Sequence, residues 1–373
     1  MKAITSAICF FILLPLPGFS QFCLPNGIIF SRQSQLDSFP LSYPGCILIE
    51  GDLHIEGDDI VNINGLYPIV AIKGNLLITY NQNLDNLEGL HSLRTIEGSL
   101  SIIQNSKLKS LNGLTSLESV KQDFLIHDND GLIDLSGANK FHIAKGDLLI
   151  SQNDNLVHPV GLKVDSILAT LYLDENAIMQ DLNGLDSLTY IGGDLLIQNN
   201  ASLTDLSGIH SLLYVGDHLE LVNNAALENI DAFDHSLNTP WELLIIENCP
   251  QLSDCAVMSI CNHLAADGNS IITSNASGCN SFDEVLVGCT VDLKDPKDET
   301  VIFVYPNPTS GSIEIFGIRH SGYSCKLHTI HGQFIRQWNS TVNSIDLKDN
   351  PPGIYILTIE WYDHVINKQV IRY

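Results

Sequence analysis

The stretch that decides the fold is GDLLIQNNASLTDLSGIHSLLYVG, which runs from Gly193 to Gly216. It contains a short apolar run, then an asparagine, then leucine or isoleucine residues at fixed offsets. Residues 98–121 (GSLSIIQNSKLKSLNGLTSLESVK) and 74–97 (GNLLITYNQNLDNLEGLHSLRTIE) follow the same frame. The shared template is G-x-L-x-I-x-x-N-x-x-L-x-x-L-x-G-L-x-S-L-x-x-I-x, so the stretch is one unit of a repeat.

The asparagine slot of this template recurs every 23 or 24 residues. It is occupied by Asp58, Asn81, Asn105, Asn129, Asn153, Asn176, Asn200, Asn224 and Asn248. A period of 20 to 50 residues is typical of a solenoid, in which each unit buries its apolar face by stacking on its neighbours. The sequence therefore predicts a mainly β protein: a parallel β-helix-like solenoid of about nine 23–24-residue repeats with disulfide caps, followed by a small C-terminal β-sandwich.

Alternation along each strand separates inward from outward residues. The template predicts one inward pair per repeat, namely Leu76/Ile78, Leu100/Ile102, Phe124/Ile126, Leu148/Ile150, Leu171/Leu173, Leu195/Ile197, Leu219/Leu221 and Leu243/Ile245. Buried backbone polar groups must be paired, so an asparagine at each corner is expected to bond its own turn and the next coil. We therefore expect a structural ladder of Asn81, Asn105, Asn129, Asn153, Asn176, Asn200, Asn224 and Asn248. A recurrent glycine is expected at a tight bend, at Gly89, Gly113, Gly137, Gly161, Gly184 and Gly208.

The outward slot in the middle of each strand predicts an exposed line of mostly apolar side chains. It is occupied by His54, Leu77, Ser101, Leu125, Leu149, Tyr172, Leu196, Glu220 and Leu244. The expected binding face centres on Leu125, Leu149, Tyr172 and Leu196, flanked by the acidic residues Asp123, Asp147 and Asp194, because contiguous apolar surface marks interaction sites. The alternative is that a loop, the cap or the tail covers this line.

Both ends of the chain differ from the repeat. A basic start, the apolar run AICFFILLPLPGF and small residues before Gln21 indicate a secretory signal peptide. The helical spacing of SDCAVMSICNHLA predicts a short capping helix with Ser253 as N-cap. The predicted domains are 1–20 (signal peptide), 21–50 (N-terminal cap), 51–248 (solenoid), 249–290 (disulfide-rich C-terminal cap), 291–300 (linker) and 301–373 (β-sandwich).

Eight of the nine cysteines remain after the signal peptide, and disulfides are expected in an exported chain. Cys23 and Cys46 are expected to hold the N-terminal cap. Cys255, Cys261, Cys279 and Cys289 are expected to form two bonds, with three connectivities open, and Cys249 and Cys325 are left over. Because the CxxC pairs of structural zinc sites are absent from the sequence, neither a metal site nor another cofactor is expected.

Negative charge is concentrated in the solenoid. The chain carries a formal net charge of -25, and residues 21–298 contain 37 acidic against 11 basic residues. Such a surface repels nucleic acid and anionic lipid. It fits either a solvated surface or a preference for cationic partners or divalent ions.

Two resemblances follow from the motifs. The G-x-L-x-I-x-x-N-x-x-L frame, with LNGL, LSGI and LEGL followed by SL, resembles the leucine-rich-repeat-like β-helix of receptor L domains over residues 47–265. The region 301–373 resembles the type A C-terminal sorting domain of the type IX secretion system of Bacteroidota, through Tyr305, Pro306, Asn307, Pro308, Gly332, Pro352, Gly353, Ile354, Tyr355 and Lys368. The second resemblance implies contact with the type IX secretion machinery, passage through the outer membrane, removal of the tail, and either release or attachment to surface lipopolysaccharide.

The leading hypothesis is a secreted or cell-surface, non-enzymatic recognition or adhesion protein that binds a protein or glycan on the sheet face. The alternative is a structural surface-layer or matrix spacer without a specific ligand. An enzyme is disfavoured, because His127 with Asp128 and Asp130, and Ser151 near Asp154, show neither a complementary base nor an oxyanion frame. Asp-Ser-Ile and Asp-Ser-Leu make Ser166 and Ser187 candidate O-glycosylation sites of the kind used by Bacteroidota.

Overall fold

The computed structural model describes two parts of the chain. These are residues 22–291 except 236, 238 and 239, and residues 303–372 except 306–308, 310, 317–322, 331, 340–343, 362 and 363. The predicted signal peptide, the predicted linker from residue 292 onward and the motif residues Pro306, Asn307 and Pro308 lie outside the described residues.

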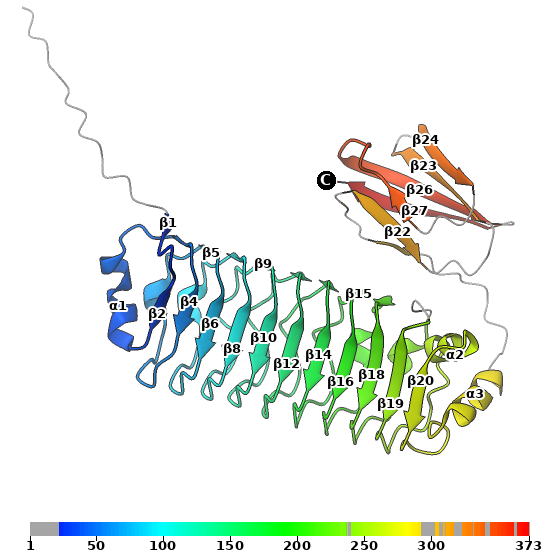
Figure 1. The fold of residues 1–373 in the computed structure, drawn as a ribbon, viewed down its shortest axis with the longest axis horizontal. Helices are drawn as coiled ribbons and strands as arrows, with labels where there is room; N and C mark the ends of the chain where they lie inside the picture. Colours follow the sequence, from blue (N-terminus) through cyan, green and yellow to red (C-terminus); the bar gives the residue numbers. More distant parts are fainter. Residues whose placement is uncertain are drawn as a thin grey trace, which may run out of the picture.

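Residues 22–273 form a solenoid whose coils stack into two parallel sheets (Figure 1). The main sheet has eleven strands in the order β2-β4-β6-β8-β10-β12-β14-β16-β18-β19-β20. These are β2 (Ile28–Phe30), β4 (Leu53–Ile55), β6 (Leu76–Thr79), β8 (Leu100–Ile103), β10 (Phe124–His127), β12 (Leu148–Ser151), β14 (Leu171–Asp174), β16 (Leu195–Gln198), β18 (His218–Val222), β19 (Leu243–Glu247) and β20 (Ser270–Thr273). The predicted parallel solenoid is confirmed.

A second sheet of nine two-residue strands forms another wall of the coil. Its strands are β1 (Phe22–Cys23), β3 (Leu48–Ile49), β5 (Ala71–Ile72), β7 (Thr95–Ile96), β9 (Ser119–Val120), β11 (Ile143–Ala144), β13 (Ser166–Ile167), β15 (Tyr190–Ile191) and β17 (Tyr214–Val215). Four coils add a 3-10 turn: η1 (Asn64–Leu66), η2 (Glu88–Leu90), η3 (Ser207–Ile209) and η4 (Asp231–Phe233).

The inward slots build one continuous apolar core through the array. Leu195 and Ile197 are fully buried, as are the equivalent pairs from Leu76/Ile78 to Leu219/Leu221. The prediction for the last pair is wrong: Leu244 and Ile246 point inward in β19, while Leu243 and Ile245 are only partly buried. Leu219 pairs with Leu244, 25 residues on, so one extra residue before β19 reverses the faces of that strand.

The corner asparagines form a buried hydrogen-bonded column. Asn153 donates its backbone N–H to Oδ1 of Asn176 (3.2 Å) and its Nδ2 to the carbonyls of Ile126 (3.1 Å) and Ser151 (2.9 Å). Oδ1 of Asn153 accepts the backbone N–H of Asn129 at 3.1 Å. Asn81, Asn105, Asn129, Asn153, Asn176, Asn200 and Asn224 are all inaccessible to solvent. Each coil thus uses one amide to pair backbone groups that the bend would otherwise leave unsatisfied.

The column differs from the prediction at both of its ends. Asn248 is exposed and has a φ of 54°. In the other coils this left-handed conformation belongs to the residue just before the buried asparagine, such as Gln152 with a φ of 53°. Cys249 occupies the buried slot instead, because of the extra residue before β19. Asn275 continues the column by accepting the Cys249 backbone N–H at 2.9 Å. At the other end Gly57, and not Asp58, donates its N–H to Oδ1 of Asn81 at 3.0 Å.

The recurrent glycines lie where successive coils touch. Gly113 and Gly137 have φ of 117° and 121°, and a Cβ at Gly113 would stand 1.9 Å from the Leu87 carbonyl oxygen of the preceding coil. Gly89 and Gly208 lie in 3-10 turns instead, yet a Cβ there would be equally close to backbone, 1.8 Å and 2.0 Å away. Close approach of backbones is therefore the shared reason for glycine, and positive φ applies to only some of these positions.

Helices close the solenoid at both ends (Figure 1). Helix α1 (Gln33–Ser42) packs at the start, and α2 (Met258–Ala265) and α3 (Phe282–Val291) pack at the far end. Val257, and not Ser253, precedes the first turn of α2 as its N-cap residue, and no side-chain bond caps it there. Three disulfides join Cys23 to Cys46, Cys255 to Cys279 and Cys261 to Cys289. Because β1, β2 and β20 belong to the two sheets, the coil extends past residues 51 and 248 into both caps.

The C-terminal part is an antiparallel two-sheet domain with its own core. One sheet contains β21 (Phe303–Tyr305), β22 (Ser312–Phe316) and β25 (Ser344–Asp346). The other contains β23 (Ser324–Thr329), β24 (Phe334–Asn339), β26 (Gly353–Trp361) and β27 (His364–Arg372). Leu327, Leu357, Ile359 and Cys325 are buried between the sheets. The predicted small β-sandwich is confirmed.

Candidate functional site

The outer face of the main sheet carries a line of side chains in exact strand register, which we call the stripe. Its pairs include Leu125 with Leu149, Leu149 with Tyr172, and Tyr172 with Leu196. The stripe consists of Ile29, His54, Leu77, Ser101, Leu125, Leu149, Tyr172, Leu196, Glu220, Ile245 and Ile271.

The stripe is accessible to solvent along its length. Leu125, Leu149, Tyr172 and Leu196 are half-buried, as expected for neighbours that cover one another across strands about 4.8 Å apart. Ile29 and Ile271, at the two ends, are 62% and 46% exposed. Leu244 is not part of this line, because the register change in β19 places Ile245 opposite Glu220.

Tyr172 is the largest side chain of the stripe, and its phenol is held in place. Burial raises the pKa of Tyr172 to about 12, and the hydrogen bond between the phenol and Asp174 adds to the shift. The Tyr172 phenol thus has a nearby carboxylate, Asp174, as its hydrogen-bond partner. Leucines on both adjacent strands, Leu149 and Leu196, flank this aromatic side chain.

The acidic side chains beside the stripe also have a structural role that the sequence did not reveal. Asp123 Oδ1 accepts the backbone N–H of Asp147 at 3.0 Å, and Asp147 Oδ1 accepts that of Thr170 at 2.9 Å. Asp194 Oδ1 in turn accepts the backbone N–H of His218 at 3.0 Å. These carboxylates form a second column at the start of the strands, and they carry charge beside the stripe at the same time.

Two of the candidate catalytic residues named for an enzyme, His127 and Ser151, contact each other on this face. His127 Nδ1 lies 2.9 Å from Ser151 Oγ, since the two residues are paired in register on β10 and β12. A nucleophilic serine also needs donors for an oxyanion. The nearby N–H groups of Asp128 and Gln152 already donate to the carbonyls of Ser151 (3.1 Å) and Asp174 (3.0 Å). The pair thus has the geometry of a cross-coil hydrogen bond, and these two N–H groups are already used in the sheet.

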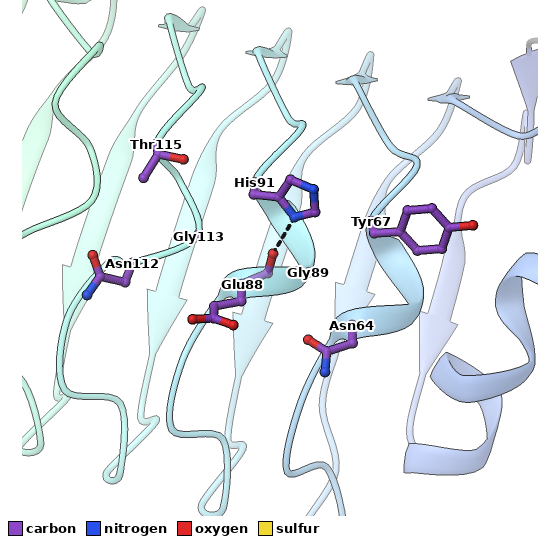
Figure 2. A pocket seen from close by; sticks show the side chains of 8 residues that line it. All are labelled: Asn64, Tyr67, Glu88, Gly89, His91, Asn112, Gly113 and Thr115. Carbon is purple, nitrogen blue, oxygen red and sulfur yellow. Dashed lines mark hydrogen bonds between the residues drawn. The ribbon is translucent and has the colours of Figure 1, made fainter.

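Two open hollows lie away from the main sheet, where the 3-10 turns face solvent. The first, about 490 Å³, spans three coils (Figure 2). Figure 2 shows Tyr67, His91 and Thr115 on successive coils, with Glu88 beside His91, whose Nδ1 is 2.8 Å from the Glu88 carbonyl oxygen. The second, about 450 Å³, is lined by equivalent positions around His210 and Asp231. The first lies over Gly89 and Gly113, where successive coils approach too closely for a Cβ.

The two candidate glycosylation sites differ sharply in exposure. Ser187 is exposed, whereas Ser166 lies in β13 between Ile143 and Tyr190 and is 8% accessible. Low accessibility in the folded coil disfavours modification of Ser166. Both sites stay predictions, and Ser187 is the more accessible of the two.

The described sorting-motif residues lie in the C-terminal sandwich. Tyr305 is in β21, Gly353 begins β26 and Lys368 lies in β27 opposite Leu357. Tyr355 is buried and donates its hydroxyl to the Pro351 carbonyl. In the described parts of the chain, no helix is long and apolar enough to cross a membrane, and no group of three His, Cys, Asp or Glu side chains could hold a metal ion.

Comparison with known families agrees with this architecture. Residues 45–167 match the family model described as Receptor L domain, and residues 303–372 match the one described as Secretion system C-terminal sorting domain. The chain thus combines a segment similar to receptor L domains with a segment similar to secretion sorting domains. No curated protein matches the chain. The sorting domain marks it for type IX export to the cell surface or the extracellular space, and neither matched family is enzymatic.

The L-domain match ends in β13, but the structural repeat does not. Asn176, Asn200 and Asn224 continue the buried column, and β14 to β20 continue the main sheet. Tyr172 and Leu196 lie just beyond the match, in the same register as Leu125 and Leu149 within it. The stripe thus crosses the end of the matched segment without interruption.

Proposed function

We propose that the exported protein is a recognition or adhesion protein that binds an extracellular protein or glycan on the outer face of the main sheet. The observation that carries the proposal is the stripe: one side chain per coil, most of them apolar, aligned in register and partly accessible to solvent. A contiguous apolar line on an exported chain is a typical interaction surface.

The centre of the stripe suits an anchor. Tyr172 is large, amphipathic and flanked by Leu149 and Leu196, and interface energy concentrates in a few aromatic or basic residues at the centre of a patch. Asp147 and Asp194 lie at its edge, where charges act mainly on association rate and salt dependence.

An array of peptides, proteins and glycans, screened with the full chain and with two variants, tests this proposal. Tyr172→Ala should abolish or weaken capture of the partner. Tyr67→Ala is the matched control, because Tyr67 is a solvent-accessible tyrosine (54% exposed) that lines the hollow away from the main sheet. Binding lost with Tyr67→Ala but kept with Tyr172→Ala would place recognition in the hollow. A chain that captures nothing would favour the structural spacer.

A further inference from the structure

The two halves of the solenoid differ in how their acidic residues are compensated. Residues 22–163 contain 16 acidic and nine Lys or Arg residues, whereas residues 164–291 contain 18 acidic residues and no Lys or Arg. In the first half, cations on adjacent coils pair with carboxylates: Lys73 with Glu50 (3.6 Å), Arg94 with Glu118 (3.2 Å) and Lys121 with Glu97 (3.0 Å). The second half has no Lys or Arg for such pairs; there, His218 Nδ1 lies 3.1 Å from Asp194 and its Nε2 lies 3.7 Å from Glu242.

On the outer face of the main sheet and at the corner that follows its strands, carboxylates of the second half accept hydrogen bonds from neutral side chains. Gln152 Nε2 donates to Glu175, Gln198 Nε2 donates to Glu220 at 2.9 Å, and Asn199 Nδ2 donates to Asp174 at 2.7 Å. An amide fixes the position of a carboxylate but leaves its charge in place. This part of the face is therefore an ordered anionic surface.

Glu220 lies within the stripe itself. From β12 to β20 the stripe reads Leu149, Tyr172, Leu196, Glu220, Ile245 and Ile271. Apolar side chains thus stand on both sides of one carboxylate. A complementary ligand has apolar groups at both ends and a positive charge opposite Glu220.

The spacing suits an extended polypeptide. Five steps of about 4.8 Å give a length of about 24 Å, which an extended chain covers with about seven residues. We propose that the half of the face from Leu149 to Ile271 binds an extended, basic polypeptide segment with apolar side chains, and that a Lys or Arg of this segment lies opposite Glu220. This inference rests on the proposed function and adds the chemistry of its partner.

Three synthetic seven-residue peptides test the inference by fluorescence polarisation with the full chain. The probe, called the Leu-Lys peptide, carries Leu at positions 1, 3 and 7 and Lys at position 5, with Ser between them, so that an extended chain presents all four side chains on one face. One control replaces the Lys with Glu, and the other replaces every Leu with Ser. The Leu-Lys peptide should bind most tightly and weaken as salt rises, because ions screen exposed charges. Equal binding of the Leu-Glu peptide would overturn the inference.

Variants separate a specific site from general attraction. Glu220→Gln should weaken the Leu-Lys peptide about twofold to fivefold, the range of one partly exposed ion pair. Glu228→Gln removes the same charge from an exposed position outside the stripe and should leave affinity unchanged. Tyr172→Ala should also weaken binding. If Glu220→Gln and Glu228→Gln change the affinity equally, or if Tyr172→Ala does not change it, the peptide binds by nonspecific charge attraction. Either result would overturn the inference.

The inference and the proposed function can fail separately. The array partner could be a glycan or a neutral protein whose binding is lost in Tyr172→Ala, while the Leu-Lys peptide does not bind. The face would then be a recognition site, and the inference of a cationic partner would be wrong. If Tyr172→Ala affects neither the array partner nor the peptide, both are wrong.

Discussion

Cys249 gives Asn224 the acceptor that an asparagine gives in the preceding coils. The Cys249 sulfur accepts hydrogen bonds from the backbone and the side chain of Asn224, and it lies 3.7 Å from the Leu221 carbonyl and 3.6 Å from that of Glu247. Burial raises the pKa of the thiol, and the bonds from Asn224 oppose that shift. A neutral thiol thus continues the amide column where the repeat is one residue longer.

Replacing Cys249 tests whether this contact stabilises the end of the solenoid. Cys249→Ala should lower the free energy of unfolding by about 1–3 kcal/mol, because buried donors of Asn224 lose their acceptor. Cys249→Asn should be at least as stable as the wild type, since the amide restores the column. Denaturant unfolding measures both, and an alanine variant as stable as the wild type would show that the sulfur is a space filler.

Substitution of an asparagine in the middle of the buried column should lower stability more than substitution of an asparagine at the surface. Asn153→Ala removes a buried amide with partners on both sides and should cost about 1–3 kcal/mol. Asn112→Ala, at an exposed turn, is the matched control and should change stability by less than about 0.5 kcal/mol. Equal melting temperatures for the two variants would contradict a structural role for the column.

The C-terminal cap should weaken on acidification. His263 is buried; its Nδ1 accepts the Trp241 backbone N–H at 3.2 Å and its Nε2 lies 3.0 Å from the Asn269 carbonyl. Burial lowers the pKa of His263 below 6.5, although the bond to Asn269 opposes the shift. The unfolded chain then binds the proton more readily, so this contribution is present above pH 6.5 and is lost as pH falls through the lower, folded-state pKa.

Thermal melts between pH 7.5 and 4.5 measure this effect. His263→Gln lacks the titrating ring, so its melting temperature should fall less steeply with pH than that of the wild type. Parallel pH profiles for the two proteins would show that His263 does not contribute.

Export should remove the C-terminal sandwich. The linker between the two described parts is polar and charge-rich, and the sorting-domain match begins at residue 303. The mature protein should therefore end near residues 295–303. Peptide mapping of surface or secreted material should not recover GIYILTIEWYDHVINK, and its presence in the mature protein would contradict processing at the linker.

The sequence predicted most of the solenoid because its physical constraint is periodic. Each coil must bury the same slots against its neighbours, so Leu195, Ile197 and Asn200 could be assigned from spacing alone. The extra residue before β19 could not be predicted from spacing. Asn248 keeps the 24-residue spacing, but the buried slot moves to Cys249. The backbone contacts at Gly57 and Asn275 could not be predicted from spacing either, since the template does not hold at the ends.

The candidate site was less predictable, because its important contacts join different coils. The sequence placed Tyr172 and Leu196 on one outward line but did not show that Asp147 and Asp194 also bond backbone groups of the next coil. The contact between His127 and Ser151 was missed for the same reason. Comparing equivalent slots 24 residues apart, and not neighbours along the chain, is the signal that could have found it.

The most direct test of recognition by the stripe is the affinity of the array partner for the full chain and for Tyr172→Ala, measured beside Tyr67→Ala by calorimetry. Loss of the central anchor should weaken binding by about 1–4 kcal/mol, which is about fivefold to several hundredfold in Kd, with folding unchanged because Tyr172 points away from the core. Tyr67→Ala should bind as the wild type does. A partner that binds Tyr172→Ala with undiminished affinity would contradict the account.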